Sequence, residues 1–222
     1  MAQTYDDRSV SKVEVTGTEA RYYDFFMNVI TGGTYPFFIR KAIQEMDIHP
    51  GNEILVLGCG TGRNLQLMDK HLDGKGRIVG LDIGPEMLEQ SQCRFANVSH
   101  VAIKNQRIDE VLPYENEFDK VFISFVLHGF IQEDREKIIA NAQRALRPGG
   151  EFIILDYNEF DLEHAPWLVR FVFKMECPLA TDFIERDLQA ILREWGFNEF
   201  RVHPHYLGYV RVLAARKIGG RI

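Results

Sequence analysis

The sequence contains little cysteine and no long apolar run. Cys59, Cys93 and Cys177 are the only three cysteines, and no two of them have the C-x-x-C spacing of zinc or redox motifs. Their odd number argues against a disulfide framework and predicts a reducing, cytoplasmic compartment. No apolar stretch approaches the roughly 18 residues that a membrane-spanning helix needs. The polar, acidic start of the chain does not have the pattern of a signal peptide.

An excess of positive charge is also missing. The 26 Lys and Arg residues face 32 Asp and Glu residues, which gives a formal net charge of −6. This balance argues against a nucleic-acid partner held mainly by phosphate contacts. The rest of the composition, 45% hydrophobic and 26% charged, is typical of a globular protein. The length predicts one domain over residues 1–222.

Strand and helix patterns alternate along the chain. Apolar runs predict strands near 53–57, 77–82, 98–103, 118–125, 151–156, 199–203 and 206–215. Helices are expected near 62–72, 85–95, 132–146 and 182–195, and two more over 19–46. The alternation predicts an α/β fold with a parallel sheet covered on both faces and an antiparallel strand at its edge. Asp182 and Glu185 form a candidate capping box, and residues 158–181 are interpreted as an insertion.

The stretch "EILVLGCGTGRN" joins a predicted strand to a predicted helix through Gly58, Gly60 and Gly62. Glycine permits positive φ angles and lets a ligand approach the backbone. The helix that follows offers free N–H groups and the positive end of its dipole. Because Arg63 occupies the sixth position, the pattern is G-x-G-x-G and not the G-x-G-x-x-G of dinucleotide-binding folds. A purely structural turn is the alternative.

A second feature strengthens the ligand-binding interpretation. The predicted strand from Arg77 to Leu81 ends in Asp82, 24 residues after Gly58. In doubly wound folds, an acid about 20 residues after the glycines accepts hydrogen bonds from a ribose diol. The alternative is that Asp82 only caps the next helix, which Pro85 helps to start.

Five segments in this order make the chain similar to the class I S-adenosylmethionine-dependent methyltransferases: "LGCGTGRN", "GLDIGPEML", "LPYENEFDKVFISFVLHGF", "ALRPGGEFIILDY" and "ILREWGF". The likeness is strongest to the small-molecule group that includes the ubiquinone/menaquinone C-methyltransferases. It implies a three-layer, Rossmann-like fold with a seven-stranded sheet of order 3-2-1-4-5-7-6, strand 7 being antiparallel. It also implies an N-terminal helical lid over residues 1–46, a transferase activity and S-adenosylmethionine as cofactor.

The same resemblance implies a set of cofactor contacts. Gly58, Gly60 and Gly62 would bound the methionine part, and Asp82 would take the ribose hydroxyls. The adenine would lie between Ile83 and Met87. The other positions implied as cofactor contacts are Cys59, Asn64, Arg107, Ile108, Ser124 and Tyr23.

Two positions depart from the family pattern. Val56 stands where the family commonly has an acid near the methionine ammonium. Backbone carbonyls, water or another acid would then meet this charge, and Asp6, Asp7 and Asp24 of the N-terminal segment are the candidate acids. Ile108 stands where the family often has an Asp that faces the adenine. Adenine recognition would then depend on backbone groups, on Gln106 or on Asp109.

The expected chemistry is an in-line displacement, so the protein mainly aligns the reactants and excludes water. A base is needed only when the acceptor must lose a proton. His128, in the segment from Ser124 that would border the methyl-transfer site, is the candidate base because histidine titrates near neutrality. Its alternative role is a hydrogen bond to the cofactor or backbone. Tyr157 is expected to shape the acceptor pocket, with core packing as its alternative.

The predicted insertion suggests possible partners. It carries large apolar side chains beside two cations, namely Trp167, Phe171, Phe173, Met175, Arg170 and Lys174. This pattern predicts either peripheral membrane contact through 165–178 or closure over an apolar substrate. A buried segment or a homodimer interface is the alternative. His203 and His205 lack a third ligand beside them, so no metal site is expected.

The sequence therefore predicts methyl transfer to a small-molecule acceptor that is apolar or amphiphilic, either quinone-like or a phospholipid headgroup. A small thiol or amine is the alternative acceptor. A non-catalytic protein that binds S-adenosylmethionine and serves a regulatory role is the rival class of function.

Overall fold

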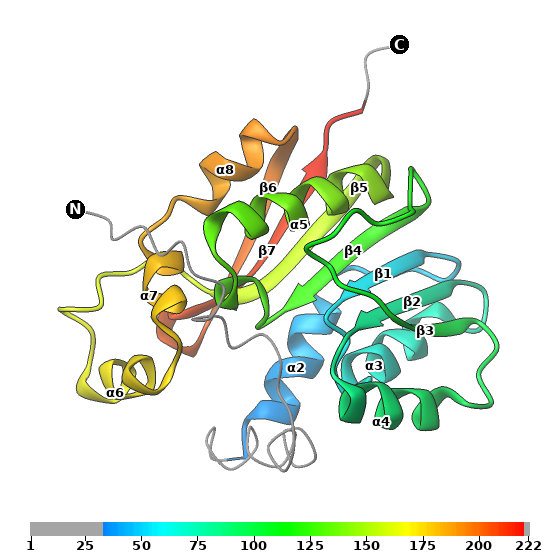
Figure 1. Ribbon diagram of the computed structural model, residues 1–222, viewed down its shortest axis with the longest axis horizontal. Coiled ribbons are helices and arrows are strands. Elements are labelled where there is room, and N and C mark those ends of the chain that lie inside the picture. Colours follow the sequence, from blue (N-terminus) through cyan, green and yellow to red (C-terminus); the bar gives the residue numbers. More distant parts are fainter. Residues whose placement is uncertain (1–32, 220–222) are drawn as a thin grey trace.

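The computed structural model describes residues 33–219, which form one seven-stranded sheet of order β3-β2-β1-β4-β5-β7-β6 (Figure 1). The strands are β1 (Glu53–Leu57), β2 (Arg77–Asp82), β3 (Val101–Asn105), β4 (Phe118–Ser124), β5 (Leu146–Tyr157), β6 (Phe197–His205) and β7 (Val210–Lys217). Strand β7 is antiparallel to both of its neighbours, and the pairs from β3 to β5 are parallel. The fold class, the strand order and the antiparallel strand predicted from the sequence are confirmed.

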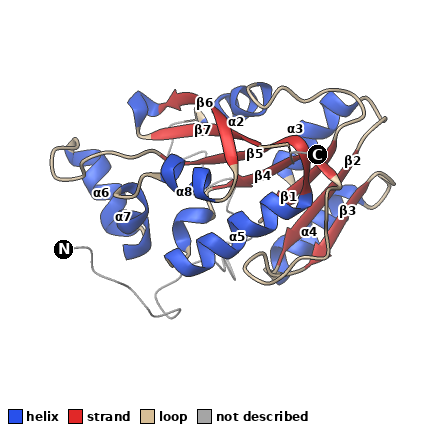
Figure 2. Ribbon diagram, turned by 90° about the horizontal axis from the view of Figure 1, so that it is seen from above, coloured by secondary structure: helices blue, strands red, loops and turns tan. Residues whose placement is uncertain are grey.

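Helices cover both faces of the sheet. They are α2 (Tyr35–Gln44), α3 (Arg63–Leu72), α4 (Pro85–Phe95), α5 (Gln132–Ala145), α6 (Trp167–Met175), α7 (Pro178–Ile184) and α8 (Leu188–Glu194). Figure 2 shows α5, α7 and α8 on one side of the strands. Two short 3₁₀ turns, η2 (Leu127–Gly129) and η3 (Tyr206–Gly208), follow β4 and β6 at the end of the sheet where β5 finishes.

Strand β1 shows why the sheet needs two helical layers. Its side chains alternate between faces, as the strand geometry requires. Leu55 and Leu57 belong to the core formed with α5, α7 and α8. Ile54 and Val56 belong to the core formed with α2, α3 and α4. Val56 is 2% exposed, so an acid at this position would be buried in the apolar layer under α2.

Helix α2 is the described part of the expected N-terminal lid. Its apolar side chains Phe38, Ile39, Ala42 and Ile43 are buried in the second core. This part of the segment therefore packs as an ordinary covering helix of the sheet. Residues 1–32, with Tyr23 and the candidate acids of the lid, lie outside the described residues.

The prediction of a single helix over 182–195 is wrong. The chain forms α7 and α8 there, and Asp187 caps α8 by accepting a hydrogen bond from the N–H of Ala190 at 2.9 Å. Asp182 is not a capping residue but lies inside α7. Its carboxylate binds the guanidinium groups of Arg135, 47 residues away, and of Arg186, four residues away, both at 2.6 Å. These two ion pairs leave it unavailable as a cap.

The segment 158–181 holds a loop, α6 and the first turn of α7, and it lies at the carboxyl end of the parallel strands (Figure 1). Across residues 33–219, no helix combines the length and the apolar character needed to cross a bilayer.

Candidate functional site

The loop from β1 to α3 contains three left-handed glycines. Gly58, Gly60 and Gly62 have φ angles of 72°, 54° and 78°, a region that side-chain-bearing residues rarely adopt. A Cβ atom at Gly58 would lie 2.9 Å from the Val126 side chain, and one at Gly62 would lie 2.9 Å from the Phe95 ring. At Gly60 the nearest atom would be the sulfur of Met87, 4.0 Å away. Gly58 and Gly62 therefore pack against protein, whereas Gly60 faces open space.

Asp82 holds this loop to the end of β2. Its Oδ2 accepts a hydrogen bond from the N–H of Gly60 at 2.7 Å. Its Oδ1 accepts from the N–H groups of Ile83 and Gly84 at 2.8 and 2.9 Å. These three bonds occupy three of about four lone-pair positions on the carboxylate. Asp82 thus organises the loop and the start of α4, and its contact with a ribose diol stays a prediction.

A hollow of about 360 Å³, open at its mouth, lies at the carboxyl ends of β1 and β2. Its lining residues are Gly58, Asp82, Ile83, Gln106, Ile108, Asp109, Val126 and Phe130. The structure thus brings four predicted cofactor residues together with Gln106 and Asp109, the two alternatives for adenine recognition. The crevice beyond the carboxyl ends of parallel strands is where open α/β sheets bind ligands.

The other predicted cofactor residues lie around this hollow in different ways. Met87 is buried in the first turn of α4, where it faces Gly60. Arg107 is bound to Asp109, with its Nε and Nη2 atoms 3.1 and 2.9 Å from the carboxylate oxygens. Asn64 lies in the first turn of α3 and Ser124 ends β4, and both are half-buried.

Cys59 points into the protein core. Its side chain belongs to the cluster under α2 and α3, and its N–H donates to the carbonyl of Leu81 at 2.8 Å. Burial, together with the nearby charge of Asp82, raises the pKa of the thiol well above its usual range. The side chain is therefore neutral, and a ligand in the loop would reach only the backbone of Cys59.

The hollow and the loop fit the cofactor implied by the sequence. Apolar walls from Ile83, Ile108 and Val126 suit an adenine ring, and Asp82, which accepts the hydrogen bond from the Gly60 N–H, places a carboxylate in the same hollow. The space beside the Gly60 Cα is open, and a side chain at this position would fill it. S-adenosylmethionine would therefore be held between the glycine loop, the end of β2 and the loop after β3.

A second polar cluster lies at the ends of β4 and β5. His128 Nδ1 is 2.7 Å from Asp156 Oδ1, and its backbone N–H is 3.3 Å from Asp156 Oδ2. Because an ionised carboxylate only accepts hydrogen bonds, Nδ1 is the donor. His128 Nε2 lies 3.8 Å from Glu176, which also accepts a 2.6 Å hydrogen bond from the Tyr157 hydroxyl.

The electrostatic setting of His128 favours its charged form. Burial alone would lower its pKa, but the charge and hydrogen bond of Asp156, with the charge of Glu176, outweigh burial and raise the pKa above its ordinary value. Arg135 opposes this shift only weakly. His128 would act as a base only after losing this proton, so base catalysis would strengthen as pH rises.

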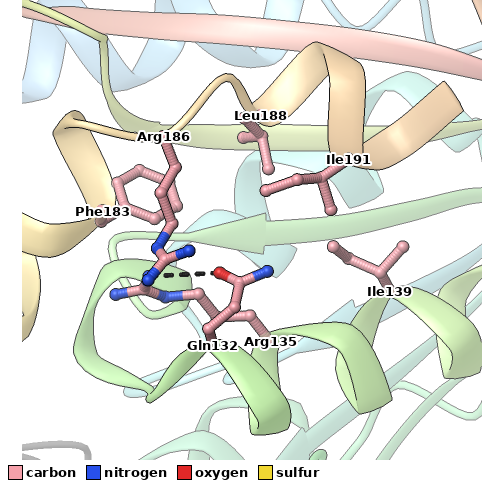
Figure 3. Close-up of a pocket in the computed structure, with 7 residues that line it drawn as sticks. All are labelled: Gln132, Arg135, Ile139, Phe183, Arg186, Leu188 and Ile191. Atoms are coloured by element: carbon pink, nitrogen blue, oxygen red, sulfur yellow. Dashed lines mark hydrogen bonds between the residues drawn. The ribbon is translucent and has the colours of Figure 1, made fainter. Parts of the chain in front are cut away.

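Arg135 fixes the turn that carries His128. It is 2% exposed and donates to the carbonyls of Leu127, His128 and Leu179 at 3.3, 3.1 and 2.8 Å. Its Nη1 also binds Asp182 in α7. Figure 3 shows Arg135 with Gln132 and Arg186 beside a small pocket whose other walls are apolar. One guanidinium group therefore joins η2 to α7.

Two residues of the second cluster were missed from the sequence. Asp156 follows directly after the buried run "FIIL" near the end of β5, and an acid at this place beside β4 was a signal that could have identified it. Glu176 follows α6 and reaches Tyr157 from 19 residues away, and no local pattern marks it. His128 and Tyr157, which were predicted, lie together with ring centroids 4.9 Å apart.

Within residues 33–219, no group of three metal-ligating side chains comes together. His205 instead binds Glu45, with Nε2 2.8 Å from the carboxylate.

Comparisons with known proteins agree with this geometry. A family model described as a methyltransferase domain matches residues 54–150. An uncharacterised methyltransferase of Synechocystis is 30% identical, over 81% of this chain and 82% of its own length. The ubiquinone/menaquinone biosynthesis C-methyltransferase UbiE of Shewanella frigidimarina is 30% identical, over 90% of this chain and 79% of its own length.

A solved structure shows the same fold at lower identity. The crystal structure of a SAM-dependent methyltransferase from Aquifex aeolicus superimposes with a TM-score of 0.63 and 20% identity, covering 81% of this chain and 89% of the other.

The glycine loop gives a matched pair of variants. Gly62→Ala should lower the free energy of unfolding by about 2 kcal/mol or more, because the left-handed φ costs about 1–2 kcal/mol and Phe95 leaves no room. Gly60→Ala should lower the free energy of unfolding only by the strain of the left-handed φ, but it should weaken S-adenosylmethionine binding at least about tenfold. Denaturant unfolding and calorimetry measure the two effects. Equal cofactor affinity in Gly60→Ala and wild type would mean that Gly60 does not face the cofactor.

The raised pKa of His128 predicts a pH-dependent stability. A group whose pKa is raised on folding stabilises the protein below its unfolded pKa of about 6.5, and the contribution is lost as pH rises through the folded pKa. The difference in melting temperature between wild type and His128→Gln should be largest below about pH 6.5 and shrink at higher pH. A difference that grows with pH would contradict the assigned interaction with Asp156.

Proposed function

The chain belongs to the class I S-adenosylmethionine-dependent methyltransferases, and from this membership we propose that it methylates a small quinone-like acceptor that is apolar or amphiphilic. When bound, S-adenosylmethionine supplies an activated methyl group on its sulfonium. The chain's own residues must bind both reactants, align them, exclude water and accept any proton that the acceptor releases.

The observation that carries the acceptor proposal is the cluster of aromatic rings around Tyr157. Phe125, His128 and Phe173 have ring centroids 6.1, 4.9 and 4.8 Å from that of Tyr157. Phe160 extends this ring cluster, with its ring centroid 5.4 Å from that of Phe173. Flat aromatic surfaces favour an aromatic or quinone-like ring, since stacked and edge-on ring contacts stabilise such a ligand beyond its area alone.

The segment after β4 links the two halves of the proposed site. Val126 and Phe130 line the cofactor hollow, and His128 between them faces the polar cluster. In the proposal, Gly60 and Asp82 hold the cofactor on one side of this segment. The acceptor then lies on the other side against Tyr157, so a short turn separates donor from acceptor.

The proton released by a hydroxyl-bearing ring would go to Nε2 of neutral His128. Asp156 keeps the proton on Nδ1, orients the ring and stabilises the imidazolium that forms. Glu176 stabilises the same cation and holds the Tyr157 hydroxyl. A base positioned in this way contributes about 10²–10⁴-fold to rate.

A phospholipid headgroup is less well supported as an acceptor. Its phosphate would need a cation, and the guanidinium that touches the His128 turn, that of Arg135, is already bound to Asp182 and three carbonyls. A small thiol or amine needs no such cation and remains the competing acceptor. A non-catalytic role for the cofactor site is the competing function.

An acceptor panel tests the proposal. Purified protein with S-adenosylmethionine receives a naphthohydroquinone, phosphoethanolamine, a small thiol or a small amine, and S-adenosylhomocysteine is measured. We expect product above the acceptor-free rate only with the hydroquinone. We also expect kcat/KM to rise with pH through a pKa above 6.5, and His128→Gln to remove this rise. Turnover with the amine or thiol alone would overturn the acceptor class, and no turnover with any acceptor would support the non-catalytic role.

A further inference from the structure

Helix α6 has two apolar faces, although only one of them packs against the protein. Phe173 is buried, and its ring contacts those of Tyr157 and Phe160. On the other side, Trp167, Leu168, Phe171 and Met175 are 73%, 57%, 54% and 68% exposed. At about 100° per residue, these four side chains share one stripe roughly 100° wide. Helix α6 has only nine residues, and four of them form this exposed apolar stripe. They are therefore a contiguous patch and not single apolar residues scattered over the surface.

A strained turn exposes another apolar residue at the same end of the molecule. Leu207, in η3 before β7, is 98% exposed and has a left-handed φ of 59°, and Tyr206 before it has a φ of 46°. Left-handed backbone at two successive non-glycine residues costs free energy. Ring contacts connect this turn to α6. The ring centroid of Tyr209, directly after the turn, lies 4.8 Å from that of Phe160, and Phe160 contacts Phe173 of α6.

The charges beside the stripe indicate what covers it. Arg170 and Lys174 are exposed on the same helix, next to the apolar stripe, although the chain as a whole carries a net charge of −6. Glu176 points inward to Tyr157, and Asp161 in the preceding loop is bound to His164. A tryptophan-bearing apolar stripe edged by cations is the pattern of a helix that lies in the interface of an anionic bilayer.

We propose that the exposed stripe of α6, together with Leu207, docks on an anionic lipid surface. Trp167, Phe171 and Met175 enter the headgroup boundary, and Arg170 and Lys174 contact the anionic headgroups. The opposite face of the same helix contributes Phe173 to the ring cluster at Tyr157, so docking places the proposed acceptor site beside the bilayer. The link to an apolar acceptor rests on the proposed function, but docking itself can be measured without cofactor or acceptor.

Vesicle flotation of the full chain tests this directly. Wild type should float with vesicles of phosphatidylglycerol and phosphatidylcholine, and at least about fivefold less with phosphatidylcholine alone. Phe171→Asp and Leu207→Asp should each lower the partition coefficient about tenfold or more, because a buried apolar side chain is replaced by a charge. Arg170→Gln with Lys174→Gln should remove the preference for anionic vesicles.

Ile218→Asp is the matched control. The exposed fraction of Ile218, 50%, is similar to the 54% of Phe171. Ile218, however, follows β7, which is antiparallel to β5 and so ends where β5 begins, at the other end of the strands from α6. It should bind vesicles as wild type does, and unchanged melting temperatures would show that the variants fold. Failure of wild type to float, or equal floating of Phe171→Asp and wild type, would overturn the proposal. The proposal would also be overturned if wild type sedimented as a dimer and did not bind vesicles, while Phe171→Asp sedimented as a monomer.

These outcomes are separable from those of the acceptor panel. A chain that floats but methylates none of the acceptors keeps the docking proposal and loses the proposed acceptor. A chain that methylates the hydroquinone but does not float keeps the function and loses the docking surface.

Discussion

The hydrogen bond from the Gly60 N–H to Asp82 is the interaction on which the rest of the site depends. It ties the glycine loop after β1 to the end of β2 at 2.7 Å. With the loop in this position, Gly58 packs directly against Val126, and Val126 begins the turn that carries His128. The cofactor hollow and the polar cluster are therefore two sides of one packed arrangement. A shift of the loop would move the walls of both.

Buried charge holds the second half of the site together. Asp156 and Glu176 raise the pKa of His128, whereas burial lowers the pKa of Arg135 despite its bond to Asp182. Each cation is retained in the interior because carboxylates and carbonyls satisfy its donors. Removing one partner of such a group would leave the other buried and uncompensated. The network thus fixes the turn Leu127–Gly129 between the sheet and the insertion helices.

The sequence was informative wherever the signal was local. Apolar runs and glycine breaks predicted the strands, and β1 and β2 have the predicted bounds. The glycine loop and Asp82 were identified because a strand, a bare turn and a helix lie within a short stretch. Val56 is explained by its place in β1, where it faces the core under α2. The sequence could not predict the break between α7 and α8, since it accompanies the ion pair from Asp182 to Arg135, 47 residues away. Glu176 was missed for the same reason, because its role comes from a fold-dependent contact with Tyr157.

Calorimetry of S-adenosylmethionine binding to wild type and Asp82→Ala shows whether the glycine loop and Asp82 form the cofactor site. Wild type should bind one molecule per chain. Asp82→Ala, with its cooperative unfolding retained, should bind at least about tenfold more weakly, because charge-assisted hydrogen bonds worth roughly 1.5–3 kcal/mol are lost. Equal affinity in the two proteins would contradict the account, since the loop and the hollow would then not form the cofactor site.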